Sequence, residues 1–138
     1  MCVLNAFGTR FAVDRFRTKT SLRIHGVRKR GQPRFPRSKS GASKHEVSGI
    51  TVVVSDAPWS DLPAQIRDAE RFLSKHRREI ARLRRWPGVQ IVVLDFPIDL
   101  RIGRRIAAQF DRFPASLVRK AGSLGLALEL SIYRTDGS

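Results

Sequence analysis

A long amphipathic stretch between two β-branched runs constrains the fold of this chain more than any other feature. Residues 49–56 and 90–95 are apolar runs of strand length, each closed by an aspartate. Between them, residues 60–86 carry apolar side chains at helical spacing, namely Leu62, Ile66, Ala69, Leu73, Ile80 and Leu83. This pattern predicts one long helix, with Ser60 as its N-cap, Asp61 in its first turn and a stop at Trp86-Pro87-Gly88.

Shorter elements flank this strand–helix–strand unit. The sequence favours a short helix near residues 11–18 and then an extended segment through Leu22 and Ile24, although Phe11, Val13, Leu22 and Ile24 also alternate well enough for strands. Residues 96–113 are loosely helical around a glycine and stay undecided. The remaining predicted elements are strands at 3–7 and 126–133 and a short helix at 114–122.

These elements predict an α+β fold, with a single mixed, mainly antiparallel β-sheet and with one long and two short helices packed on one face. The long helix has one apolar stripe, so it can cover only one face of a sheet. If the strands on either side of it are parallel, their connection is a right-handed crossover. We expect residues 1–138 to form a single domain, with an exposed basic loop at 28–44 that is rich in Gly, Pro and Ser.

The chain is strongly basic, with 27 Lys and Arg against 12 Asp and Glu and a net charge of +15. Such a charge attracts any polyanion through a summed, salt-sensitive field. Because 21 of the 27 cations are arginine, the codon usage of a GC-rich genome is an alternative explanation. No apolar run reaches the roughly 18–20 residues that span a bilayer, and a secretory signal is not recognisable, so we expect a cytoplasmic protein.

Two groups of cations are candidate binding residues for a polyanion or another partner. One group recurs every three or four residues along the predicted helix, opposite its apolar stripe, where each like-charged pair costs about 0.2–0.5 kcal/mol. The other group lies in the basic loop, where one aromatic residue is interleaved with arginines. The helix group is Arg67, Arg71, Lys75, Arg78, Arg82 and Arg85, and the loop group is Arg28, Lys29, Arg30, Arg34, Phe35 and Arg37.

No motif in the sequence names a reaction. His76 lies in the apolar stripe of the long helix, and Asp95 and Asp99 follow a predicted central strand, where functional carboxylates often occur. Half-buried packing of the histidine and ordinary turn chemistry of the aspartates explain these positions better than a catalytic role does. Cys2 is the only cysteine, and no Cys/His cluster has the spacing of a zinc site. We therefore expect no catalytic residues, metal or cofactor.

Several short segments resemble a bacterial family called domain of unknown function 4279. They are residues 112–133, residues 73–83, Leu94-Asp95-Phe96, the pair Val13-Asp14 after Phe11, and the Arg30-Gly31 turn. The resemblance implies a small α+β fold and an association with toxin-immunity and interaction proteins, and it carries over no catalytic residues. The net charge of +15 departs from that family, whose members are not notably basic.

Together these observations predict a non-catalytic binding domain. The first expectation is an unassigned protein partner, such as an acidic protein in an immunity-like pairing. The alternative is non-specific binding of RNA or DNA through the basic helix face and the basic loop.

Overall fold

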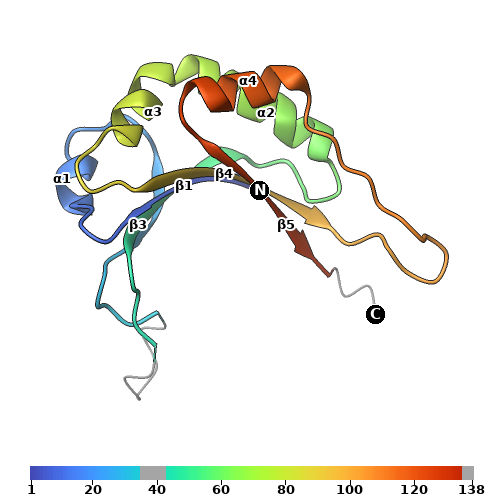
Figure 1. The fold of residues 1–138 in the computed structure, drawn as a ribbon, viewed down its shortest axis with the longest axis horizontal. Coiled ribbons are helices and arrows are strands. Elements are labelled where there is room, and N and C mark those ends of the chain that lie inside the picture. The colour runs from blue at the N-terminus through green and yellow to red at the C-terminus, as the bar shows by residue number, and fades with distance from the viewer. Residues whose placement is uncertain (35–42, 135–138) are drawn as a thin grey trace.

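The computed structural model describes residues 1–34 and 43–134, which form one β-sheet with helices on one of its faces (Figure 1). This confirms the predicted α+β fold with a mixed, mainly antiparallel sheet. In chain order the elements are β1 (Cys2–Gly8), α1 (Val13–Arg17), β2 (Ile24–Arg28), β3 (Ser48–Ser55), α2 (Leu62–Lys75), α3 (Arg77–Arg84), β4 (Ile91–Asp99), α4 (Ala115–Ser123) and β5 (Ala127–Tyr133).

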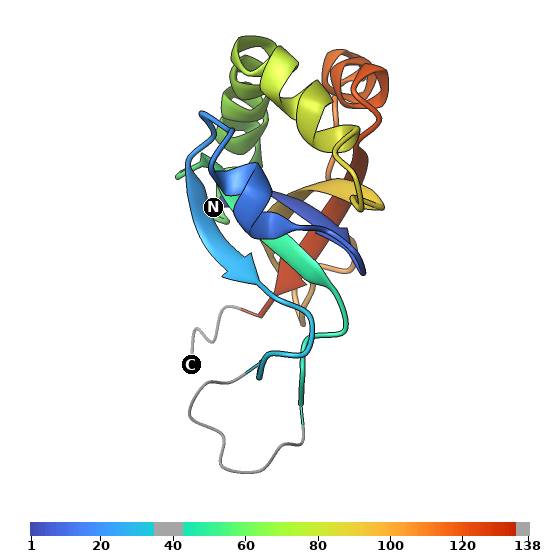
Figure 2. The ribbon, with the colours of Figure 1, turned by 90° about the vertical axis from the view of Figure 1, so that its left-hand side faces the viewer.

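The strands lie in the order β2-β3-β1-β4-β5. β1 is antiparallel to both β3 and β4, β2 is antiparallel to β3, and β4 is parallel to β5. The first four strands and their connections follow the ferredoxin-like β-α-β-β-α-β arrangement, which α4 and β5 extend at one edge. Figure 2 shows β2 on one side of the sheet and β5 with α4 on the other.

The core lies between the sheet and the helices. Alternate side chains of β1, β3 and β4 face the helices, so that Leu4, Ile50 and Leu94 are fully buried. Each such side chain contributes about 1.5–3 kcal/mol by leaving water. The helices bury the apolar stripe predicted from the sequence, namely Leu62, Ile66, Ala69, Leu73, Ile80 and Leu83.

The prediction of one unbroken long helix is wrong, because α2 and α3 meet at His76, whose φ of −106° and ψ of 21° are not helical. The break lies among the cations Lys75, Arg77 and Arg78, where a continuous helix would hold like charges at i, i+3 spacing. His76 is also a weaker helix former than its neighbours, which adds to the local cost. The two helices instead follow the curved sheet as two shorter pieces (Figure 1).

The predicted N-cap also needs correction. Asp61, not Ser60, caps α2, because its side chain accepts a hydrogen bond from the backbone N–H of Ala64 over 3.0 Å. A carboxylate at this position also interacts favourably with the positive end of the helix dipole.

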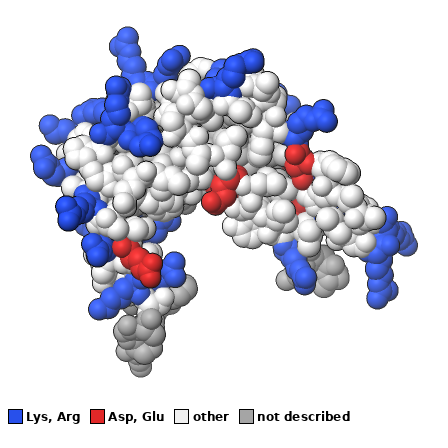
Figure 3. Space-filling model, viewed as in Figure 1, with Lys and Arg blue, Asp and Glu red and all other residues white. Residues whose placement is uncertain are grey.

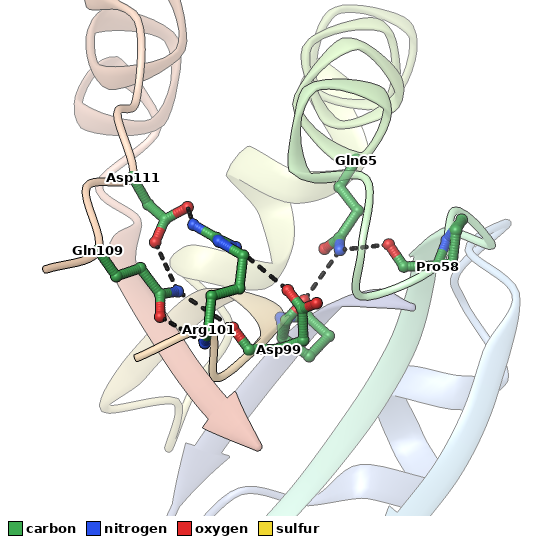
Figure 4. Close-up of polar contacts among 7 residues, drawn as sticks. Pro58, Gln65, Asp99, Arg101, Gln109 and Asp111 are labelled. Carbon is green, nitrogen blue, oxygen red and sulfur yellow. Dashed lines mark hydrogen bonds and ion pairs between the residues drawn. The ribbon is translucent and has the colours of Figure 1, made fainter. Parts of the chain in front are cut away.

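β4 continues to Asp99, so the loosely helical pattern that begins at residue 96 does not produce a helix there. The connection from β4 to α4 is held by a clamp of four side chains, Asp99, Arg101, Gln109 and Asp111 (Figure 4). The Arg101 guanidinium lies 3.1 Å from the Asp99 carboxylate and 2.8 Å from that of Asp111. Gln109 donates to the backbone carbonyl of Asp99 and to the Asp111 carboxylate, both over 3.0 Å.

Beside this clamp, Gln65 is a fully buried polar residue of α2 (Figure 4). Its amide nitrogen donates to the carbonyls of Pro58 and Pro97, over 3.1 and 2.9 Å. One side chain thus ties α2 both to the turn before it and to β4.

Candidate functional site

A groove runs along the helix layer between α2–α3 on one side and α4 on the other. One part is a hollow of about 910 Å³, and the other is a hollow of about 580 Å³. A small hollow of about 70 Å³ joins them, because it shares Ser74 and Lys120 with the first part and Arg77 and Ser123 with the second. We call this continuous feature the helix groove.

Seven cations line the helix groove. Arg67, Arg71, Lys75 and Lys120 line the larger part, and Arg77, Arg84 and Arg85 line the other. Figure 3 shows Lys and Arg side chains gathered over the helix layer, most densely toward α3. The one acidic residue in the lining, Glu70, accepts a hydrogen bond from the Ser116 hydroxyl of α4. The groove is therefore strongly positive.

Few of these charges are neutralised within the described residues. Among the seven cations, Arg71 alone forms an ion pair there, with its guanidinium 2.7 Å from the Asp68 carboxylate. The Ser55 hydroxyl also donates to Asp68 over 2.6 Å, and these contacts hold the pKa of Asp68 below its usual value. Asp68 is thus a carboxylate at neutral pH, and it offsets one of the seven positive charges.

The lining has no large apolar side chain that is exposed. None of the residues that line the three hollows is aromatic, and its large apolar residues, Leu73 and Leu124, are both buried. In the larger part, the apolar surface comes from the aliphatic stems of long side chains, whose guanidinium and ammonium groups supply the charge. An arrangement of this kind can bind several oxyanions in a row through charge-assisted hydrogen bonds.

Only some of the cations in the predicted helix group reach the groove. Arg67, Arg71, Lys75 and Arg85 line it, whereas Arg78 and Arg82 do not appear in its lining. Arg82 has another role, because it donates to the carbonyl of Lys19 over 2.8 Å and its guanidinium lies 5.5 Å from the centre of the Trp86 ring. It holds α3 to the segment that follows α1.

Three groove residues were missed by sequence reasoning, namely Arg77, Arg84 and Lys120. A signal for two of them exists, because Ser74, Arg77, Ala81 and Arg84 recur at spacings of three, four and three residues beside the apolar stripe. No signal marks Lys120, because it reaches the groove only through the packing of α4 against α2.

The described residues of the predicted basic loop do not adjoin the helix groove. Figure 2 shows that the described parts of the β2–β3 connection, residues 29–34 and 43–47, extend below the sheet, away from the helices. Arg28 is half-buried, and its guanidinium lies 4.7 Å from the centre of the Phe7 ring, where burial lowers its pKa. Lys29 pairs with Asp14 over 2.8 Å, and Arg30 and Arg34 are exposed. Phe35 and Arg37 lie outside the described residues.

The candidate catalytic residues are not brought together either. His76 lies in the helix layer, where its ring centre is 4.6 Å from that of Phe72. Asp95 is on the opposite face of the sheet and accepts a hydrogen bond of 2.6 Å from the Ser131 hydroxyl. Asp99 is paired with Arg101 in the clamp. Each of the three has a structural partner, and no hollow described above contains any of them.

Two searches of the described residues gave negative findings. Within residues 1–34 and 43–134, no three His, Cys, Asp or Glu side chains lie together as metal ligands would. In the same part of the chain, none of the helices has the length and apolar character needed to cross a bilayer.

Comparison with known proteins found no match for this chain among protein-family models, curated proteins or solved structures. The resemblance to domain of unknown function 4279 therefore stays a prediction, and the helix groove is the feature from which a function can be argued.

Proposed function

We propose that this protein is a non-catalytic, non-specific nucleic-acid-binding domain that holds the phosphate backbone of RNA or DNA in the helix groove. The observation that carries this proposal is the lining of the groove, with seven cations from three helices and a single acid. Phosphate groups along a nucleic-acid strand are the commonest partners of such a row, and their binding releases counterions. The proposal fits the cytoplasmic location expected from the sequence, because RNA is abundant in the cytoplasm.

An acidic protein is a weaker candidate for the same groove. Protein interfaces are centred on buried aromatic or apolar anchors, surrounded by a polar rim. The lining offers no aromatic residue, and Leu73 and Leu124 are buried already. A phosphate backbone needs no apolar anchor, because its affinity comes from charge alone. The groove therefore favours the nucleic acid, which was the second expectation from the sequence.

The open face of the sheet is a less suitable surface for a nucleic acid. It carries two acids, Asp95 on β4 and Glu129 on β5, and they would repel phosphate groups. Its Arg28 is already engaged, because it stacks on Phe7 and donates to the Thr51 hydroxyl over 3.3 Å. The open face is therefore less suited to a phosphate backbone than the helix groove.

Neighbouring arginines on α3 provide a matched test of the groove. Arg77 lines it and Arg78 does not, although both are exposed and adjacent in the chain. We expect Arg77→Glu to weaken binding of a labelled single-stranded RNA roughly five- to tenfold at physiological salt, because a charge-assisted contact is replaced by repulsion. Arg78→Glu makes the same change in net charge and should weaken binding less than about twofold. Fluorescence anisotropy measures both affinities.

A third variant, Arg104→Glu, places the same charge change in the exposed β4–α4 connection and should behave like Arg78→Glu. Equal losses in all three variants would mean that only the total charge matters, and the groove would have no special role. Tighter binding of labelled polyglutamate than of RNA at the same salt concentration would instead identify an acidic protein as the partner.

A further inference from the structure

The two edges of the sheet differ in how well they are protected against pairing with another strand. β2 is short, has a register irregularity between Ile24 and Gly26, and is followed by Lys29 and Arg30. Short length, bulges and charge are the usual means by which proteins protect an edge. β5 is less well protected: its seven residues run without a recorded irregularity and include no proline, lysine or arginine, and its charges are Glu129 within the strand and Arg134 directly after it.

β5 also exposes apolar side chains at this edge. Leu130 is 37% exposed and Ile132 is 54% exposed, although both lie on the face of the sheet that the helices cover elsewhere. Their neighbours in register, Phe96 and Ile98 of β4, are fully buried. The helix layer therefore stops short of the last strand and leaves a strip of apolar surface beside it.

The outer side of α4 continues this strip above β5. Leu117 and Ala121 face the core, and Ser116 and Lys120 face α2, so helical geometry directs Val118 and Gly122 away from α2. Val118 is 48% exposed, and a side chain at Gly122 would meet nothing within 4 Å. This side of the helix is small and uncharged. Figure 3, which faces this edge, shows few charged side chains across the middle of the molecule.

We propose that β5 and α4 form the interface of a symmetric dimer, in which the β5 strands of two copies pair antiparallel about Leu130. In this register Leu130 lies opposite Leu130 of the second copy, Leu128 lies opposite Ile132, and Glu129 lies opposite Ser131. A two-fold axis at Glu129 would instead place two carboxylates opposite each other. The pattern of the strand is thus complementary to itself in the register that buries its apolar side chains.

The same two-fold axis brings the two copies of α4 side by side. Val118 and Gly122 would meet their counterparts there, and their small size lets the helices pack closely. A sheet of two such copies has no exposed β5 edge, and the helix layer is continuous across it. The helix grooves lie on the far side of each α4 from this interface, so the dimer forms independently of any nucleic acid.

Sedimentation equilibrium of the protein without nucleic acid tests this proposal. We expect twice the chain mass of 15.6 kDa at micromolar concentration. Leu130→Lys and Val118→Arg should each shift the protein to the single-chain mass, because they bury a charge at the interface. Ile91→Lys changes another exposed apolar residue, 44% exposed on β4, and should leave the dimer intact. Circular dichroism checks that each variant folds.

Disulfide formation tests the register. Residues directly opposite in an antiparallel pair have Cα atoms about 4.5–5.5 Å apart, which a disulfide can bridge. Leu130→Cys should therefore form a covalent dimer on oxidation, and Ile132→Cys should not, because it faces residue 128 of the second copy. The native Cys2 is buried and does not interfere. The proposal would be overturned if the wild-type protein sediments at the single-chain mass, or if neither charge variant changes the dimer. The register would be overturned if the cysteines at positions 130 and 132 crosslink equally.

Discussion

At the scale of single residues, Gly88 shows how one position holds two elements together. It ends the turn after α3 with a φ of +87°, a conformation that other residues rarely adopt. A Cβ atom at Gly88 would lie 2.2 Å from the carbonyl oxygen of Arg10, so the turn packs directly against the backbone before α1. Gln90 then donates from its backbone to Phe7 over 2.8 Å, and β4 begins.

We expect Gly88→Ala to lower the free energy of unfolding by more than about 2 kcal/mol, because the left-handed conformation costs about 1–2 kcal/mol and the backbone must also move apart. Gly31→Ala is the matched control, since its φ of +83° is similar but a side chain there would meet nothing within 4 Å. Urea unfolding measures both variants. Equal losses would show that the contact with Arg10 carries no weight.

Single residues also show which features the sequence predicts and which depend on the folded structure. The glycine was recognised as part of a helix stop because Trp86-Pro87-Gly88 is a local signal. Gln65 was not recognised as a core residue, because a glutamine on a helix usually faces water. Its burial depends on two carbonyls, those of Pro58 and Pro97, that meet only in the folded chain.

At the scale of elements, the sequence correctly predicts the strands that depend only on a local pattern of residues. It does not predict features that depend on packing between distant segments. The alternation in residues 126–133 and the β-branched run at 49–56 predicted β5 and β3, because a strand needs only a period of two. The break between α2 and α3 has no proline or glycine to mark it. It lies within the predicted cationic row, of which Arg78 and Arg82 do not line the groove.

The clamp in the β4–α4 connection makes stability depend on pH. Burial would raise the pKa of Asp111, but hydrogen bonds from Arg101 and Gln109 and the charge of Arg101 outweigh it, so the folded-state pKa is lowered. The clamp therefore contributes stability in full above the unfolded-state pKa of about 3.9, and this contribution is lost as pH falls through the folded value.

We expect Asp111→Asn to be less stable than the wild type at pH 7, because it removes the ion pair with Arg101 at 2.8 Å. The difference between the two proteins should begin to shrink as pH falls below about 4, where unfolded Asp111 becomes protonated, and should be lost below the lowered pKa of folded Asp111. Urea unfolding across this pH range follows both proteins. A difference that stays constant with pH would contradict the assigned role of the carboxylate.

At the scale of the whole molecule, the sequence supported the fold class but not the strand order. A single apolar stripe on the long helix correctly predicted a sheet with helices on one face. The groove could not be predicted, because it requires α4 to lie beside α2 in the folded protein. About forty residues of the chain separate these two helices, and a periodic pattern within one helix does not indicate which distant helix packs beside it. The composition shows that the chain is strongly basic, but it does not show that several of the cations surround a hollow.

The central claim is that phosphate groups bind in the helix groove, and the salt dependence of RNA binding tests it most directly. For a single strand, each neutralised phosphate contributes about −0.7 to the slope of log K against log salt concentration, so up to seven contacts predict a slope of about −3 to −5. The double variant Arg77→Glu/Lys120→Glu should make that slope shallower by about 1.4, since two contacts are lost. A slope near zero, or one that the double variant leaves unchanged, would contradict the claim.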